Sequence, residues 1–210
     1  MITTLPLASP EARAAERLRW GIIEFQVTDL QRAIAFWTRA LGLQVRAQDS
    51  QRVELGTQAK TLFVFHAGAT VPVSPRYSGM YHVAIGLPSQ VEFSRLLARL
   101  ISLRIPVAPT DHLLAKSLYL QDPDGLEIEL TFETPERFGR FGDMSRGLVL
   151  YDAQGNTHSG RSALDVEAEL SHAPKTGLDA PLSNDTYLAH MHFKVPHLEA
   201  SASWFEGIGF

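Results

Sequence analysis

The sequence contains no cysteine in its 210 residues. This absence excludes disulfide bonds, thiolate metal sites and a cysteine nucleophile. A metal ion bound by this chain would therefore need histidine, aspartate or glutamate ligands, and eight histidines are available.

Long apolar runs and clusters of basic residues are also missing. No stretch approaches the ~18 uninterrupted apolar residues of a membrane span, and the N-terminus lacks the pattern of a secretory signal. Nineteen Lys and Arg against 23 Asp and Glu give a net charge of −4, which argues against nucleic acid or an anionic membrane as partner. We therefore expect a cytoplasmic protein, with residues 1–19 as an N-terminal extension that contains a short helix in "SPEARAAERL".

Residues 20–68 show the pattern of a β-α-β-β-β unit. "WGIIEFQV" (20–27) predicts a strand. A capping box from Thr28 to Gln31 predicts the helix start, and the helix then runs through "LQRAIAFWTRAL" with an apolar stripe at 3.6-residue spacing and Gly42 as its C-cap. Three short strands are predicted at 44–48, 52–56 and 61–65.

Residues 79–134 repeat this order. A strand is predicted at 79–87, and a capping box from Ser89 to Glu92 precedes an amphipathic helix at 91–103. Short strands follow near 107–108, 116–120 and 127–132, and "DPDG" (122–125) is the tight turn before the last strand. The repeat indicates two copies of one structural unit.

The rest of the chain is less regular at first and then begins a third copy. Residues 135–186 are predicted to be a linker, with "LDVEAEL" as a strand or a helical turn. Residues 187–210 predict one strand and one helix. The expected fold is α+β, with paired βαβββ units in a half-open barrel-like sheet plus the start of a third unit. That third unit would expose a sheet edge and an apolar helix face, so we expect a dimer formed through the C-terminal segment, or disorder in it.

Four stretches resemble the vicinal oxygen chelate superfamily, which contains glyoxalase I, bleomycin-resistance proteins and extradiol dioxygenases. They are "VTDLQRAIAFWTRALGL" (27–43), "YHVAIGLP" (81–88), "DHLLAKSLYLQDPDGLEIEL" (111–130) and "HMHFKVPHLEASASWFEGIGF" (190–210). The second unit is most similar to the catechol-2,3-dioxygenase branch. That branch has four βαβββ units paired into two halves, so the resemblance implies a C-terminally truncated chain with a complete first half.

The resemblance also implies a metal site made of two histidines and one carboxylate, typical of Fe(II), with Mn, Zn or Ni as alternatives. His82 and Glu129 match ligand positions in the second unit, and His190 matches the ligand position on the first strand of the third unit. Ile22 holds that position in the first unit and cannot bind a metal. Two ligands are therefore expected together in the first half, either as a weak two-ligand metal site or hydrogen-bonded to each other or to the backbone in a metal-free half-barrel. The resemblance implies that the partners of His190 belong to an absent fourth unit.

The remaining histidines receive weaker interpretations. His112 matches a recurrent histidine of the dioxygenase branch, and a structural hydrogen bond is expected for it. His192 and His197 are expected to face solvent. No catalytic residue is assigned.

Three functions follow from these patterns. The first is a metal-dependent extradiol dioxygenase, or part of one, that acts on a catechol-like aromatic diol. The second is a metal-free small-molecule-binding module of the bleomycin-resistance type, which Ile22 favours. The third, a glyoxalase-like lyase, needs four ligands from two units. The chain alone is expected to be inactive and its parent to be an enzyme.

Overall fold

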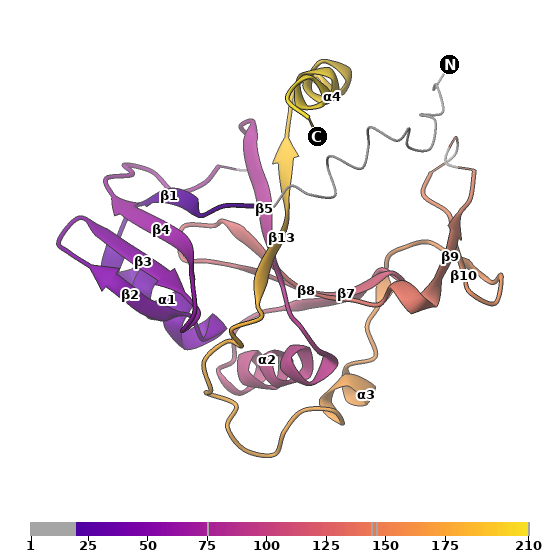
Figure 1. The fold of residues 1–210 in the computed structure, drawn as a ribbon, viewed down its shortest axis with the longest axis horizontal. Helices are drawn as coiled ribbons and strands as arrows, with labels where there is room; N and C mark the ends of the chain where they lie inside the picture. The colour runs from indigo at the N-terminus through magenta and orange to yellow at the C-terminus, as the bar shows by residue number, and fades with distance from the viewer. Residues whose placement is uncertain (1–19, 75, 144, 146, 210) are drawn as a thin grey trace.

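The computed structural model describes residues 20–209 except 75, 144 and 146 (Figure 1). The helix predicted within the N-terminal extension lies outside the described residues. The α+β fold of βαβββ units is confirmed, and neither of the two large sheets is closed.

The first unit contains β1 (Ile23–Val27), α1 (Leu30–Leu41), β2 (Gln44–Gln48), β3 (Arg52–Gly56) and β4 (Thr61–Ala67). Its sheet has the order β1-β4-β3-β2, with β1 parallel to β4. The prediction of Thr28 as the helix cap is wrong, because Asp29 accepts the capping hydrogen bond from the Arg32 N–H. Thr28 instead binds Asp124 of the second unit through its N–H and its hydroxyl.

The second unit contains β5 (Gly79–Gly86), α2 (Gln90–Ser102), β6 (Ala108–Asp111), β7 (Ala115–Gln121) and β8 (Glu127–Glu133). Its strands have the same order as those of the first unit, β5-β8-β7-β6. Ser89 caps α2 as predicted. Gly125 ends the predicted tight turn with φ +83°, a left-handed conformation that favours glycine.

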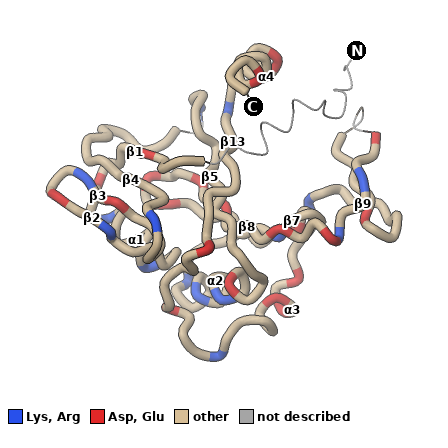
Figure 2. Tube along the Cα trace, viewed as in Figure 1, with Lys and Arg blue, Asp and Glu red and all other residues tan. Residues whose placement is uncertain are grey.

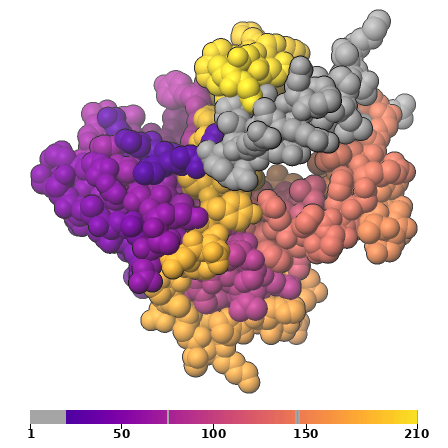
Figure 3. All heavy atoms as spheres, in the orientation of Figure 1, coloured from indigo at the N-terminus to yellow at the C-terminus, as the bar shows by residue number. Residues whose placement is uncertain are grey.

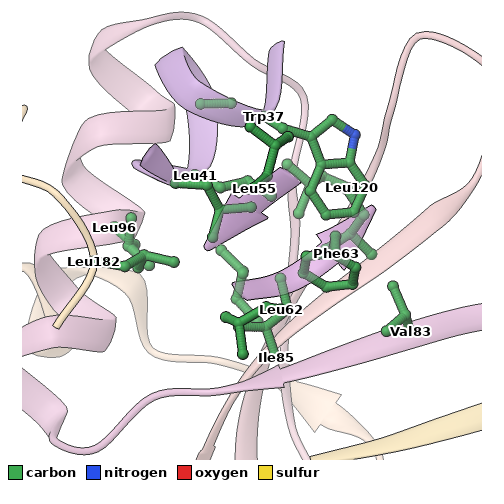
Figure 4. Packing of buried hydrophobic residues seen from close by; sticks show 14 of the residues in the cluster. Trp37, Leu41, Leu55, Leu62, Phe63, Val83, Ile85, Leu96, Leu120 and Leu182 are labelled. Atoms are coloured by element: carbon green, nitrogen blue, oxygen red, sulfur yellow. The ribbon is translucent and has the colours of Figure 1, made fainter. Parts of the chain in front are cut away.

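The helices cover one face of each sheet and share a core between the units (Figure 4). Trp37 of α1 is fully buried against Phe63 and Phe65 of β4, with ring centroids 4.9 Å away in both cases. Leu96 of α2 lies in the same core. This burial fixes the helix-covered faces, so the opposite face of each sheet is the one available for a site.

The segment predicted as a linker contains regular structure. The 3-10 helix η2 (Pro135–Arg137) leads into a small sheet of β9 (Phe138–Phe141), β10 (Leu150–Asp152) and β11 (Thr157–His158), which projects from the body in Figure 1. Then β12 (Ser162–Ala163) pairs with β6, and "LDVEAEL" forms α3 (Val166–Leu170), the helical alternative.

Residues 171–186, which we call the strap, run from α3 to the last strand and are held by two arginines of α2. Arg95 donates to the carbonyls of Leu178 and Ala180 at 3.1 and 2.8 Å. Arg99 donates to the Ala180 carbonyl and to the Arg39 carbonyl near the end of α1. These bonds tie the strap to both units and fix where the next strand begins.

The last strand, β13 (Tyr187–Lys194), pairs antiparallel with β5. The prediction that the third unit has no partner in the chain is therefore wrong for its strand, because β5 offers a free edge and the strap delivers β13 to it. The resulting sheet has the order β12-β6-β7-β8-β5-β13. In Figure 3, β13 runs between the first unit and the β9–β11 sheet.

The last helix, α4 (Leu198–Gly207), lies beyond the end of β13 and buries none of its residues. Leu198 and Trp204 are 74% and 61% exposed. Dimerisation stays a prediction; besides this helix, β13 is the last strand of its sheet and pairs with a strand on one side only.

Charges of both signs are distributed over the elements in the view of Figure 2. In the part of the chain that the structure describes, no helix combines the length and the apolar composition needed to cross a membrane.

Candidate metal site

The three predicted ligands meet on the face of the second sheet that α2 leaves open. Strand register explains the meeting. His190 on β13 lies opposite Ala84 on β5, and Ala84 lies opposite Glu129 on β8. His82 is two residues before Ala84 and therefore points to the same face. The small Ala84 side chain leaves room for His190 and Glu129 to meet above it.

The donor atoms form a nearly equilateral triangle. His82 Nε2 lies 3.0 Å from Glu129 Oε2, His190 Nε2 lies 3.1 Å from the same oxygen, and the two Nε2 atoms are 3.2 Å apart. Two ligands at right angles, each ~2.1 Å from a metal, are about 3.0 Å apart, whereas tetrahedral ligands are about 3.4 Å apart. The triangle matches three ligands on one face of an octahedron, the arrangement of a 2-His-1-carboxylate site with open positions.

Glu129 is held as a carboxylate at the bottom of this cluster. Its side chain is only 4% exposed, and Ser117 on β7 donates to its second oxygen at 2.6 Å. Burial alone would raise the pKa of Glu129, but hydrogen bonds from His190, His82 and Ser117 outweigh it and hold the pKa well below the usual range. A buried anion facing two imidazole nitrogens provides the charge that a divalent cation needs.

His82 carries an unsatisfied atom on the side away from the triangle. Its Nδ1 is buried without a hydrogen-bond partner, and the carboxylate of Glu127 lies 3.7 Å away. The hydrogen bond to Glu129 needs a proton on Nε2, whereas binding a metal through Nε2 would need the proton on Nδ1, a tautomer that a carboxylate on the far side commonly stabilises. The orphaned Nδ1 therefore fits a ligand histidine better than a structural one.

A cavity of about 530 Å³ opens above the triangle. This volume suits a small organic ligand. One side of the cavity carries His112 and Tyr119. The His112 Nδ1 donates to the Gly160 carbonyl at 2.7 Å, so its Nε2 is the acceptor for the Tyr119 hydroxyl at 3.0 Å. The hydrogen bond expected for His112 is confirmed, and the cavity places it beside the metal cluster.

Two other side chains at the cavity have shifted pKa values. Burial, together with the nearby negative charge of Glu129, raises the pKa of Tyr119, which keeps its hydroxyl protonated. Burial and the neighbouring His82 and His190 lower the pKa of His192, which favours its neutral form. His192 is exposed as expected, but it also lines the cavity.

The expectation that His190 lacks its partners is wrong. Because β13 pairs with β5 of the second unit, His190 lies beside His82 and Glu129 of that unit, and no fourth unit is needed. The local pattern pointed to each ligand but could not give this pairing, which joins residues 108 positions apart. Tyr119 and Glu127 were missed, although Tyr119 pairs with the predicted ligand Glu129 across β7 and β8, and Glu127 lies two residues before Glu129 on the same strand face. Among the described residues, His197 has no role at the cavity.

Comparison with known proteins shows the family to which the chain belongs. The model of the Glyoxalase/Bleomycin resistance protein/Dioxygenase superfamily matches residues 19–130, more than half of the chain. The chain belongs to this superfamily.

Among the relatives of this chain, a catechol-2,3-dioxygenase from Bacillus subtilis (strain 168) is 32% identical to it over 194 residues. The match covers 90% of this chain, and the chain spans 64% of that relative's length. A glyoxalase/dioxygenase from Nostoc punctiforme is 19% identical, with a TM-score of 0.49 and coverage of 63% of this chain and 99% of that one. A superfamily domain from Frankia sp. EAN1pec is 18% identical, with a TM-score of 0.48 and coverage of 55% and 91%.

Proposed function

We propose that the cavity is the active site of a metal-dependent extradiol dioxygenase that acts on an aromatic vicinal diol. The observation that carries this proposal is the triangle of His82, Glu129 and His190, whose spacing fits one face of an octahedral ion. The similarity to a catechol-2,3-dioxygenase supports it. A divalent ion bound there, for which Fe(II) is our proposal, would act as a Lewis acid for the diol and leave positions for dioxygen.

The chain's own residues have separate roles in this proposal. Glu129 supplies the negative charge, and Ser117 and Glu127 orient the ligands from behind. His112 is the base near the diol, because its Nε2 is an acceptor and its Nδ1 is held by the Gly160 carbonyl. The Tyr119 hydroxyl lies beside that acceptor and can pass a diol proton to it.

Metal content tests the proposal independently of turnover. The full chain is loaded with Fe(II) without oxygen, desalted and analysed for iron. We expect about one ion per chain, lost in His190→Ala. His66→Ala is the matched control, because His66 belongs to the first sheet, where its Nε2 lies 2.8 Å from a carboxylate oxygen of Glu24. Equal iron in wild type and His190→Ala would overturn the assignment of His190.

Catechol and oxygen added to the loaded chain test the chemistry itself. Extradiol cleavage gives a yellow product, and we expect it to disappear in His190→Ala and to fall in His112→Phe with iron retained. A fully loaded chain that binds catechol without forming this product would favour a binding module.

The metal-free binding module has one observation in its favour. Ile22 and Val64 occupy, in the first unit, the positions of His82 and Glu129 in the second, so the first sheet lacks the ligand set. A separate cavity of about 270 Å³, lined by Phe25, Tyr77 and Met80 among others, lies next to this sheet. Small-molecule binding that survives His190→Ala would locate this second activity.

A further inference from the structure

The cavity above the triangle of His82, Glu129 and His190 has an apolar wall and a polar floor. Phe141 of β9, Leu148 before β10 and Leu114 before β7 line the cavity, and each is at least 38% exposed. The floor is made of histidine, tyrosine and carboxylate groups. A ligand would therefore place polar atoms on the floor and an apolar ring against the wall.

Arg161 is the only Lys or Arg that lines this cavity within the described part of the chain. Its backbone is fixed on both sides: the preceding Gly160 carbonyl accepts from His112, and the following Ser162 pairs with Asp111 of β6.

The guanidinium of Arg161 has no carboxylate partner among the described residues, unlike several other arginines. Arg32, Arg95 and Arg137 each form an ion pair at 2.7–2.8 Å. An arginine that lines a cavity without a carboxylate partner can bind a carboxylate of a ligand through two parallel hydrogen bonds.

We propose that Arg161 selects substrates that carry a carboxylate, with the diol at the metal cluster and the acidic substituent at the cavity mouth. This inference depends on the proposed function for the orientation of the diol. The apolar wall then covers the ring between the two polar ends. Because Arg161 is exposed, solvent weakens the interaction, and we expect a preference of about three- to tenfold.

Two catechols that differ in one group provide the test: 3,4-dihydroxyphenylacetate and 4-ethylcatechol. Their Kd values are measured by calorimetry on the full chain loaded with Zn²⁺, a redox-inactive ion, at low salt without oxygen. The wild-type chain should bind 3,4-dihydroxyphenylacetate with a Kd about three- to tenfold lower than that of 4-ethylcatechol. Arg161→Leu should lose the preference, and Arg161→Lys should keep part of it. Added salt should reduce the wild-type preference.

Arg140→Leu is the matched control, because Arg140 precedes the cavity-lining Phe141 on β9, but its guanidinium lies over the Tyr151 ring at 3.8 Å and Arg140 does not line the cavity. It should leave the preference unchanged. An equal preference in wild type and Arg161→Leu would overturn the inference, as would no preference in wild type.

Metal dependence distinguishes the two proposals. If the Kd of each catechol is the same with and without Zn²⁺, the proposed function fails. In that case a preference for 3,4-dihydroxyphenylacetate that is lost in Arg161→Leu would still sustain the inference. If Zn²⁺ strengthens both catechols equally and Arg161→Leu changes neither, the proposed function survives and the inference fails.

Discussion

Substitution of Glu169 on α3, whose carboxylate is buried, should lower the free energy of unfolding more than substitution at most positions outside the His82–Glu129–His190 triangle. Glu169 is 3% exposed and forms an ion pair with Lys116 of β7. Ser94 and Gln90 of α2 donate to it at 3.3 Å. The pair therefore anchors α3, and with it the strap, against the second unit.

Glu169→Gln keeps the side-chain volume but leaves the Lys116 ammonium without its counter-charge. Breaking a buried pair costs about 3–5 kcal/mol, and we expect the lower end, about 3 kcal/mol, because 16% of the Lys116 side chain reaches solvent. For a chain of this size, the midpoint of thermal unfolding should fall by about 6–12 °C. Urea unfolding followed by circular dichroism measures the free-energy change.

A paired replacement tests whether the unpaired Lys116 charge causes the loss of stability. Lys116→Met combined with Glu169→Leu removes both charges and should recover most of the lost stability, since apolar replacements of buried pairs are often neutral. Glu167→Gln, on the exposed side of the same helix, should change stability by no more than about 0.5 kcal/mol. A Glu169→Gln loss below about 1 kcal/mol, or a double variant less stable than Glu169→Gln, would refute this account.

Three further outcomes are expected. Asp124→Asn should lower the free energy of unfolding by about 1–2 kcal/mol. Burial raises the pKa of Asp124, but hydrogen bonds from Thr28 and Arg32 outweigh burial and lower it. The stabilisation should therefore be present above pH ~4 and be lost as the pH falls through the lowered pKa. Urea unfolding at several pH values checks both effects. Glu127→Gln should weaken Zn²⁺ binding by about 10- to 100-fold, measured by competition with a chelator. Gly86→Ala should weaken Zn²⁺ binding and destabilise the fold by about 1–3 kcal/mol, because its new methyl group would overlap the Tyr187 ring at the start of β13.

Local patterns were sufficient to predict most of the secondary structure. The alternation in "WGIIEFQV", the Ser89 cap and the glycine of the 122–125 turn each act through neighbouring residues, so they can be recognised along the chain. The Thr28 cap failed because a distant residue, Asp124, competes for that side chain. Local chemistry could not reveal this competition.

The candidate site was predictable only in part: His82 and Glu129 were expected together, but the partners of His190 were expected in an absent fourth unit. His82 and Glu129 belong to one unit, and their proximity follows from the parallel pairing of its first and last strands. The position of His190 depends on which free edge β13 joins, and that choice is made by the strap and its contacts with Arg95 and Arg99. Arg161 gave no signal, because a single arginine in a polar, glycine-rich segment has no pattern around it.

In the proposed metal site the third donor comes from β13, so metal affinity would be linked to the docking of that strand. An ion that needs His190 binds only the docked state, so it draws the undocked chain toward it by mass action. At a free metal concentration of one hundred times the Kd, this contributes about 2.7 kcal/mol to the docked form. Metal supply would thus control the order of the C-terminal strand, and protease resistance around the strap would report the amount of ion bound.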